Sequence, residues 1–300
     1  MSGACANAAA VGMFDGVHLG HRDIMHTVAE CARARGGHPV VLTFREHPVS
    51  VLRPDEAPRL LTTPEEKEAL IRAFLPDAEV RMLSFAEMRG VSAGDFLRRL
   101  CADDGVGTMV MGYDNRFGCD GPREREAYDE LGRTLGMRVV HVSPLAVGAV
   151  TASSTAIRRL ILAGDVAAAA ELLDRPYSVS GTVVHGRRLG RTLGFPTANL
   201  QPDPCKLLPA AGVYEADATV DGLGRWPAMV NIGRRPTVDH RADAPLSVEA
   251  HLIGADADMY GRRMTLEFRR RLRDERRFAS PQELKAQLER DMAEISRRMQ

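Results

Sequence analysis

Short apolar runs alternate with helix-patterned stretches over the first part of the chain. The runs are rich in Val, Ala, Met and Leu, and they have the length of buried strands. They lie at Ala8–Gly12, Val40–Phe44, Val80–Leu83, Thr108–Gly112 and Arg138–Val142. Buried strands that alternate with helices are typical of a parallel sheet covered by helices on both faces. We therefore predict an α/β, doubly wound parallel-sheet domain at residues 1–174.

Some of the predicted helices carry start signals. Thr63 can cap a helix, Pro64 suits its first position and Glu66 completes a capping box. Further along, one helix is expected to begin near Ser153. A break at Gly164 separates it from an Ala-rich helix, which ends the domain.

The pattern changes near residue 175. Short, often alternating segments separated by Gly and Pro follow, as in a small antiparallel β-barrel. Ser280, Pro281 and Glu283 repeat the cap signature before a final apolar stripe, which predicts a C-terminal helix packed on the barrel. We assign this second domain to residues 175–300. The stripe consists of Leu284, Leu288, Met292 and Ile295.

Composition narrows the class of protein. The chain has 300 residues, with 40 basic and 40 acidic side chains, so no global field attracts nucleic acid or an anionic membrane. No apolar run is long enough to span a membrane, and no leader pattern stands at the N-terminus, so we expect a cytoplasmic protein. The 5 cysteines are scattered, which argues against a disulfide framework and a structural zinc site.

Two histidines stand close together in "AVGMFDGVHLGHRDIM", after the first predicted strand. His18 and His21 could be metal ligands, but zinc needs at least three protein ligands. They could equally be solvated or capping side chains. The context favours phosphate contacts, because Gly16 and Gly20 allow close backbone approach and a helix is expected to begin near His21.

The stretch "GMFDGVHLGH" resembles the first signature of the FMN adenylyltransferase module in bifunctional riboflavin kinase/FAD synthetases. That module belongs to the nucleotidylyltransferases with an H-x-G-H motif. The resemblance implies that His18 and His21 act on the phosphates of ATP during adenylyl transfer. It also places Phe14, Asp15, Gly16 and Gly20 at the ATP site.

Two further blocks resemble the same module. "GYDNRFG", at 112–118, implies that Asp114 and Phe117 contribute to the flavin pocket. "SSTAIR", at 153–158, resembles a block that binds ATP phosphates, and hydroxyls beside an Arg at a helix start suit an anion. Alone, this block could be an ordinary helix cap. Its implied ATP contacts are Ser153, Ser154, Thr155 and Arg158.

Two positions in the first domain depart from the family pattern. Met13 stands where Asn or another small residue is common, and Asn115 stands where an aromatic residue is more usual. If these changes silence adenylyl transfer, the alternative is a monofunctional riboflavin kinase. The H-x-G-H loop also leaves open another nucleotidyl acceptor.

The stretch "GTVVHGRRLGRTLGFPTANL" opens the second domain with glycines and arginines suited to phosphate. Its "GFPTAN" core resembles the riboflavin kinase signature. The resemblance implies that Thr197 and Asn199 hold Mg²⁺ with ATP, through the oxygen ligands magnesium favours. The implied kinase contacts to ATP are Gly186, Gly190, Arg191, Gly194 and Pro196.

A later block, "SVEAHLIGADADMYGRRM", resembles the kinase segment in which a strand Glu is the catalytic base, here Glu249. Gly254 and Ala255 replace a usual Asp-Phe pair. The basic "EFRRRLRDERRF" could be a nucleic-acid patch or a solvated face. Its resemblance to the kinase family favours a flap beside the flavin, with Arg273 as the flavin contact.

Together the blocks imply a bifunctional enzyme that phosphorylates riboflavin to FMN and adenylylates FMN to FAD. The expected partners are riboflavin, FMN, FAD and ATP, with no nucleic acid and no membrane. Mg²⁺ is the expected cofactor, with ATP as co-substrate and no tightly bound prosthetic group. A flavin-sensing or nucleic-acid-binding regulator without turnover is the rival from another class. The sequence leaves the oligomeric state undetermined.

Overall fold

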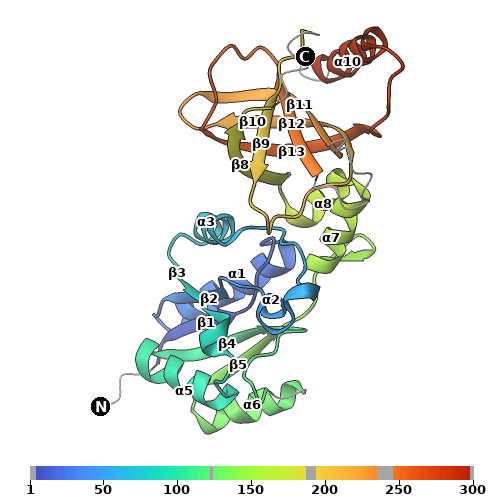
Figure 1. The fold of residues 1–300 in the computed structure, drawn as a ribbon. Helices are drawn as coiled ribbons and strands as arrows, with labels where there is room; N and C mark the ends of the chain where they lie inside the picture. Colours follow the sequence, from blue (N-terminus) through green and yellow to red (C-terminus); the bar gives the residue numbers. More distant parts are fainter. Residues whose placement is uncertain (1–4, 122–123, 187–193, 235–245, 298–300) are drawn as a thin grey trace. The chain divides into compact units, whose positions relative to one another are not determined.

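The computed structural model describes residues 5–121, 124–186, 194–234 and 246–297. The chain divides into two compact units, Met1–Ser154 and Thr155–Gln300. Each unit has its own sheet (Figure 1).

Within its described residues, the first unit holds a five-stranded parallel sheet of order β3-β2-β1-β4-β5. Its strands are β1 (Asn7–Val11), β2 (Pro39–Phe44), β3 (Glu79–Leu83), β4 (Val106–Gly112) and β5 (Arg138–Val142). The predicted doubly wound sheet is confirmed, and each predicted strand lies within two residues of an observed one. Outside it lies a small antiparallel pair, β6 (Ala146–Val147) and β7 (Val150–Thr151).

Successive residues of β1 show how both faces of this sheet are covered. Ala8 and Ala10 pack into a core with helices α1 and α3, whereas Ala9 and Val11 pack into another core with α5 and α6. This alternation follows from the period of two along a strand. The helices are α1 (Leu19–Ala34), α2 (Pro48–Leu52), α3 (Pro64–Phe74), α4 (Phe85–Met88), α5 (Ala93–Asp104) and α6 (Arg125–Thr134), with a 3₁₀ turn at Pro54–Glu56.

The helix starts agree with the sequence in most places. Thr63 accepts a hydrogen bond from the Glu66 amide and Glu66 accepts one from the Thr63 amide, which is the predicted capping box. Helix α1 begins earlier than expected, at Leu19, with His18 at its N-cap. This difference matters because it puts the first histidine at the helix terminus and the second within its first turn.

The second unit is built on a closed antiparallel barrel of six strands, all within the described residues. Their order around the barrel is β10-β11-β12-β9-β8-β13. The strands are β8 (Tyr177–Val184), β9 (Ala198–Pro202), β10 (Gly212–Val220), β11 (Gly224–Arg234), β12 (Leu246–Leu252) and β13 (Arg263–Arg273). The predicted barrel is confirmed. Strand β9, which begins at Ala198 and carries Asn199 of the P-T-A-N block, was not foreseen as a strand.

Three helices accompany the barrel in the part of the second unit that the structure describes. They are α7 (Ser154–Ala163), α8 (Val166–Leu173) and α10 (Pro281–Ser296). The C-terminal helix α10 starts as predicted, with Ser280 accepting from the Glu283 amide, and Ile295 packs with Phe195 and Met229 of the barrel unit. The compact units divide ahead of α7 and α8, and α8 packs against β8 and β13. The domain boundary expected at residue 174, which would separate the two predicted activities, stays a prediction.

Candidate active sites

The H-x-G-H loop joins β1 to α1 at the carboxyl edge of the sheet. The His18 and His21 rings stack with their centroids 3.5 Å apart, and the Phe14 ring meets His21 edge-on at 5.3 Å. His18 is almost completely buried. A helix N-terminus presents free amides and the positive end of the helix dipole, so this stack lies where an anion is stabilised.

The backbone of this loop adopts conformations that are sparsely populated. Phe14 has φ +46°, Gly16 has φ +86° and Val17 has φ +42°. Positive φ at a non-glycine residue costs about 1–3 kcal/mol and persists only where surrounding contacts hold it. The loop therefore depends on its neighbours for its shape.

The "SST" block lies against the H-x-G-H loop, although more than 130 residues separate them in sequence. Ser154 Oγ donates to the Asp15 carbonyl at 2.9 Å. A Cβ on Gly20 would stand 3.1 Å from the Ala152 carbonyl oxygen and 3.3 Å from the His18 ring, so a glycine suits this close approach. Ser153 and Ser154 end the first unit. Thr155 and Arg158 belong to the second, and their contact with ATP stays a prediction.

Asp15 holds a neighbouring segment of protein. Its carboxylate accepts from the Leu61 amide at 3.1 Å, from the Thr62 amide at 3.0 Å and from Thr62 Oγ1 at 3.1 Å. The Gly16 amide donates in turn to Thr62 Oγ1 at 3.0 Å. These contacts give Asp15 and Gly16 a clear part in shaping the loop, and their direct contact with ATP stays a prediction.

Lys67 is a buried residue that the sequence analysis missed. Its Nζ donates to the Met13 carbonyl at 3.0 Å and to the Phe44 carbonyl at 2.6 Å, at the ends of two neighbouring strands. Burial lowers the pKa of Lys67 to about 8, against the opposing effect of the Asp15 and Glu46 carboxylates. The sequence offered one signal for this residue, the rarity of lysine, since the chain contains only three.

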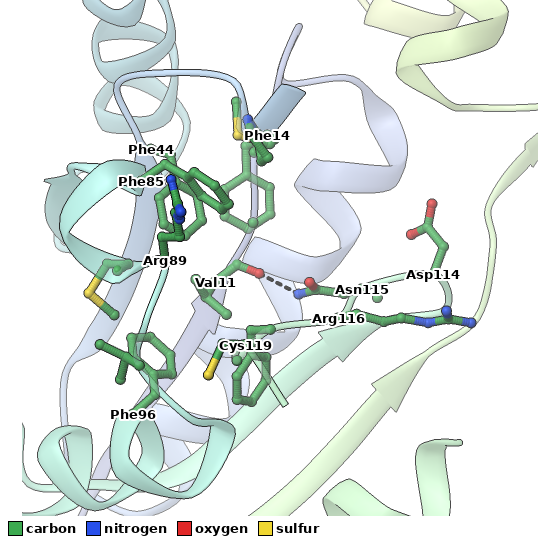
Figure 2. A pocket seen from close by; sticks show the side chains of 18 of the residues that line it. Val11, Phe14, Phe44, Phe85, Arg89, Phe96, Asp114, Asn115, Arg116 and Cys119 are labelled. Carbon is green, nitrogen blue, oxygen red and sulfur yellow. Dashed lines mark hydrogen bonds between the residues drawn. The ribbon is translucent and has the colours of Figure 1, made fainter. Parts of the chain in front are cut away.

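A cavity of about 700 Å³ lies at the carboxyl edge of the sheet (Figure 2). Its wall includes the last residues of three strands, Val11, Phe44 and Gly112, as expected for an open α/β sheet. The rest of the wall is rich in aromatic side chains and includes Arg89 and Arg116, which the sequence analysis also missed. The aromatic lining consists of Phe14, Phe44, Phe85, Phe96 and Phe117.

Asp114 and Phe117, the predicted flavin contacts, both line this cavity. The Phe117 ring packs on Tyr128 at 4.8 Å, and the Tyr128 hydroxyl donates to the Phe117 carbonyl. In Figure 2, Asn115 lies between the labelled phenyl rings and the side chain of Asp114. Asn115 itself donates from Nδ2 to the Val11 carbonyl, which ties the loop after β4 to the end of β1.

In the barrel, the predicted catalytic base and the two predicted magnesium ligands lie together. Asn199 on β9 faces Glu249 on β12 in the strand register, and Thr197 Oγ1 donates to Glu249 Oε2 at 3.5 Å. Antiparallel pairing brings these side chains, 50 residues apart in sequence, to one place. His251, which the sequence analysis did not single out, donates from Nδ1 to the Pro196 carbonyl at 2.8 Å and so supports the residue before Thr197.

Gly186 lies against the buried Asn199 side chain. A Cβ at Gly186 would stand 2.1 Å from Asn199 Nδ2, so only a glycine leaves room for that amide. Gly194 has φ +85°, which also favours glycine. The other predicted ATP contacts, Gly190 and Arg191, lie outside the described residues.

A second cavity, of about 290 Å³, lies beside these residues. Thr197, Glu249 and Arg273 line it, together with apolar side chains of the barrel and of α10. Arg273 pairs with the buried Asp291 carboxylate at 2.9 Å, and its guanidinium lies 5.8 Å from the centroid of the Phe278 ring. The predicted flavin contact is thus held in place by α10.

The donor set at Thr197 and Asn199 fits magnesium. A hydroxyl and a side-chain amide offer the hard oxygen ligands that Mg²⁺ prefers. Within the described residues, no group of three or more His, Cys, Asp or Glu side chains is placed to hold a metal ion. No helix in the described part of the chain has the length and hydropathy of a membrane span.

The fold and these sites define a two-domain transferase, with a nucleotidylyltransferase-like α/β unit and a kinase-like barrel. Residues 3–156 match the family model for FAD synthetase, and residues 173–299 match the model for riboflavin kinase. The chain belongs to the family of bifunctional riboflavin kinase/FMN adenylyltransferases, since it resembles members of that family over nearly its whole length.

Two relatives show the extent of the match. The bifunctional riboflavin kinase/FMN adenylyltransferase of Pseudomonas fluorescens is 35% identical over 95% of this chain and 90% of that protein. The protein of the same name from Bacillus subtilis is 33% identical over 96% of this chain and 91% of its own length.

A crystal structure titled as a macrolide-efflux protein from Streptococcus pneumoniae has the same fold, with a TM-score of 0.83. It is 29% identical and covers 96% of this chain and 92% of its own.

Proposed function

We propose that the chain makes FMN from riboflavin and ATP in its barrel unit, and FAD from FMN and ATP in its α/β unit. The observation that carries this proposal is that each matched domain has its own cavity beside the motif predicted to bind its phosphates. The substrates are then riboflavin, FMN and ATP, and the organic end product is FAD. We also propose that the protein works in the cytoplasm.

For adenylyl transfer, an oxygen of the FMN phosphate attacks the α-phosphorus of ATP, the bond to the bridging oxygen breaks, and pyrophosphate leaves. His18 and His21, at the N-terminus of α1, stabilise the charge that develops on the phosphates. Ser154, whose hydroxyl donates to the Asp15 carbonyl of the same loop, lines the cavity together with His21. The aromatic cavity at the sheet edge suits the flavin ring, and Arg89 and Arg116 bring positive charge to its wall.

For phosphorylation, a riboflavin hydroxyl attacks the γ-phosphorus of ATP and ADP leaves. Glu249 accepts the proton of that hydroxyl, because its carboxylate lines the cavity next to the predicted nucleotide site. Arg273, fixed by Asp291, borders the same cavity and orients the flavin. Positioning and charge neutralisation then supply most of the rate acceleration.

Magnesium is part of the proposal. Thr197 and Asn199 would hold the ion with ATP in the barrel unit, where it would neutralise phosphate charge. Dependence of FMN formation on added Mg²⁺, with loss on chelation, is the corresponding observation in solution.

One assay tests the whole proposal. The purified chain is incubated with riboflavin, ATP and Mg²⁺, and the flavins are separated. Glu249→Gln is expected to abolish FMN formation yet still convert supplied FMN to FAD, because it removes only the base of the barrel unit. His21→Ala is expected to do the reverse. FMN without FAD from the wild-type chain would favour a riboflavin kinase with a silent α/β unit, and no turnover would favour a binding protein.

A further inference from the structure

A short segment with three buried polar side chains, Thr62, Thr63 and Lys67, lies next to the H-x-G-H loop and belongs to none of the family motifs discussed above. It runs from Leu61 to Lys67, over the approach to α3 and its first turn. Thr62 is 4% exposed and Lys67 is 3% exposed. Buried polar side chains are costly unless they are hydrogen-bonded, so their partners indicate what the segment does.

The partners of Thr62 belong to the loop. Its hydroxyl donates to Asp15 Oδ1 and accepts from the Gly16 amide, and its own amide donates to the same carboxylate oxygen of Asp15. The Leu61 amide donates to the other oxygen, Oδ2. One residue of the segment thus holds both the side chain of Asp15 and the backbone of Gly16.

Lys67 holds the start of the same loop. Its ammonium joins the Met13 and Phe44 carbonyls, and Thr43 Oγ1 also donates to the Met13 carbonyl at 3.0 Å. Met13, one of the departures from the family pattern, therefore contributes a backbone carbonyl that two side chains hold in place. The neighbouring capping box of Thr63 and Glu66 serves α3 itself.

These contacts surround the three positive-φ residues of the loop, Phe14, Gly16 and Val17. A loop with this backbone relaxes when its supports are removed, and the histidines that follow it would then shift. Reacting groups tolerate displacements of well under an ångström before catalysis suffers.

We propose that the segment Leu61–Lys67 is a positioning element for adenylyl transfer, with Thr62 as the residue that sets the loop ahead of His18 and His21. This inference rests on the proposed FMN adenylyltransferase function of the α/β unit. Thr62 acts through Asp15 and Gly16, so it is a positioning residue.

The test compares Thr62→Val, which keeps the shape and removes the hydroxyl, with Thr62→Ser, which keeps the hydroxyl. Thr108→Val is the matched control, because Thr108 is a buried threonine of the same unit, on β4. We expect Thr62→Val to lower kcat for FAD formation at least tenfold, with the KM for FMN changed less than threefold. Thr62→Ser and Thr108→Val should stay within twofold of wild type.

Riboflavin phosphorylation by the same molecules is the internal reference and should not change. Hydrogen exchange should be faster in Thr62→Val over residues 13–22, and not in Thr62→Ser. If Thr62→Val does not fold, Lys67→Gln loosens the loop from its other side and should give the same kcat loss.

The outcomes separate the inference from the function on which it rests. A Thr62→Val chain with wild-type kcat and exchange overturns the inference alone. So does an equal loss in Thr62→Ser, or a loss shared by both activities. A wild-type chain that forms FMN but no FAD overturns the proposed adenylyl transfer instead.

Discussion

Replacing Gly186 by Ala tests the geometry of the barrel site most directly. The new Cβ would stand 2.1 Å from Asn199 Nδ2 and 2.5 Å from Asn199 Cγ, whereas ordinary contacts begin at 3.4 Å. The amide must therefore move by about 1.3 Å at its closest atom. Asn199 is buried and lies on a strand paired on both sides, so the strain falls on the side chain that is proposed to hold Mg²⁺ and ATP.

A displacement of about 1 Å costs on the order of 100-fold in rate, or about 2.7 kcal/mol of transition-state stabilisation. We expect Gly186→Ala to lower kcat for riboflavin phosphorylation by about that factor. Conversion of FMN to FAD by the same sample should be unchanged, because it depends on the other unit.

Gly254→Ala is the control. Gly254 lies in the same unit and has φ +78°, with nothing within 4 Å of an added Cβ. This variant should lose some stability from backbone strain and keep its kinase activity. Wild-type kinase activity in Gly186→Ala would refute the argument, since Asn199 would then tolerate a displacement that the site is proposed to forbid.

Two further predictions concern stability. Between pH 8 and 10.5 the unfolded state binds more protons at Lys67 than the folded state, because the folded-state pKa is about 8. The free energy of unfolding of the first unit should therefore rise with pH by up to about 3 kcal/mol relative to Lys67→Met. Urea unfolding followed by circular dichroism measures this, and the same dependence of the unfolding free energy on pH in both chains would contradict it. Thr63→Ala should cost about 1 kcal/mol by removing the capping box of α3, which lowers the Tm of that unit by about 2–4 °C. Trp226, the single tryptophan of the chain, lies in the other unit, so the unfolding transition followed by its fluorescence should not change.

Local patterns decided much of the fold. The apolar runs gave all five strands of the sheet, because a parallel strand buried on both faces is hydrophobic along its whole length. Cap signatures located the starts of α3 and α10 to the residue. Strand β9 was missed because Gly and Pro precede it and its residues read as a phosphate loop. The start of α1 was misjudged because His18 is not one of the preferred capping residues.

In the candidate sites, too, some features followed from local sequence motifs and others only from the structure. Motifs gave the residue types for phosphate and flavin chemistry. They gave no sign that Asn115 donates to Val11, that His251 supports Pro196, or that Asp291 fixes Arg273. Those contacts join residues 18 to 104 positions apart in the chain, beyond the reach of a helix or turn spacing.

The sequence by itself determined the two architectures and the family, and it predicted the residues that are proposed to carry the chemistry, because periodicity, caps and short motifs are local properties of a chain. Only the tertiary structure decided how those residues are held. Buried polar groups need hydrogen-bond partners, and the fold decides which partners lie within reach. Thr62 and Lys67 therefore bond to a loop about 50 residues away in the sequence.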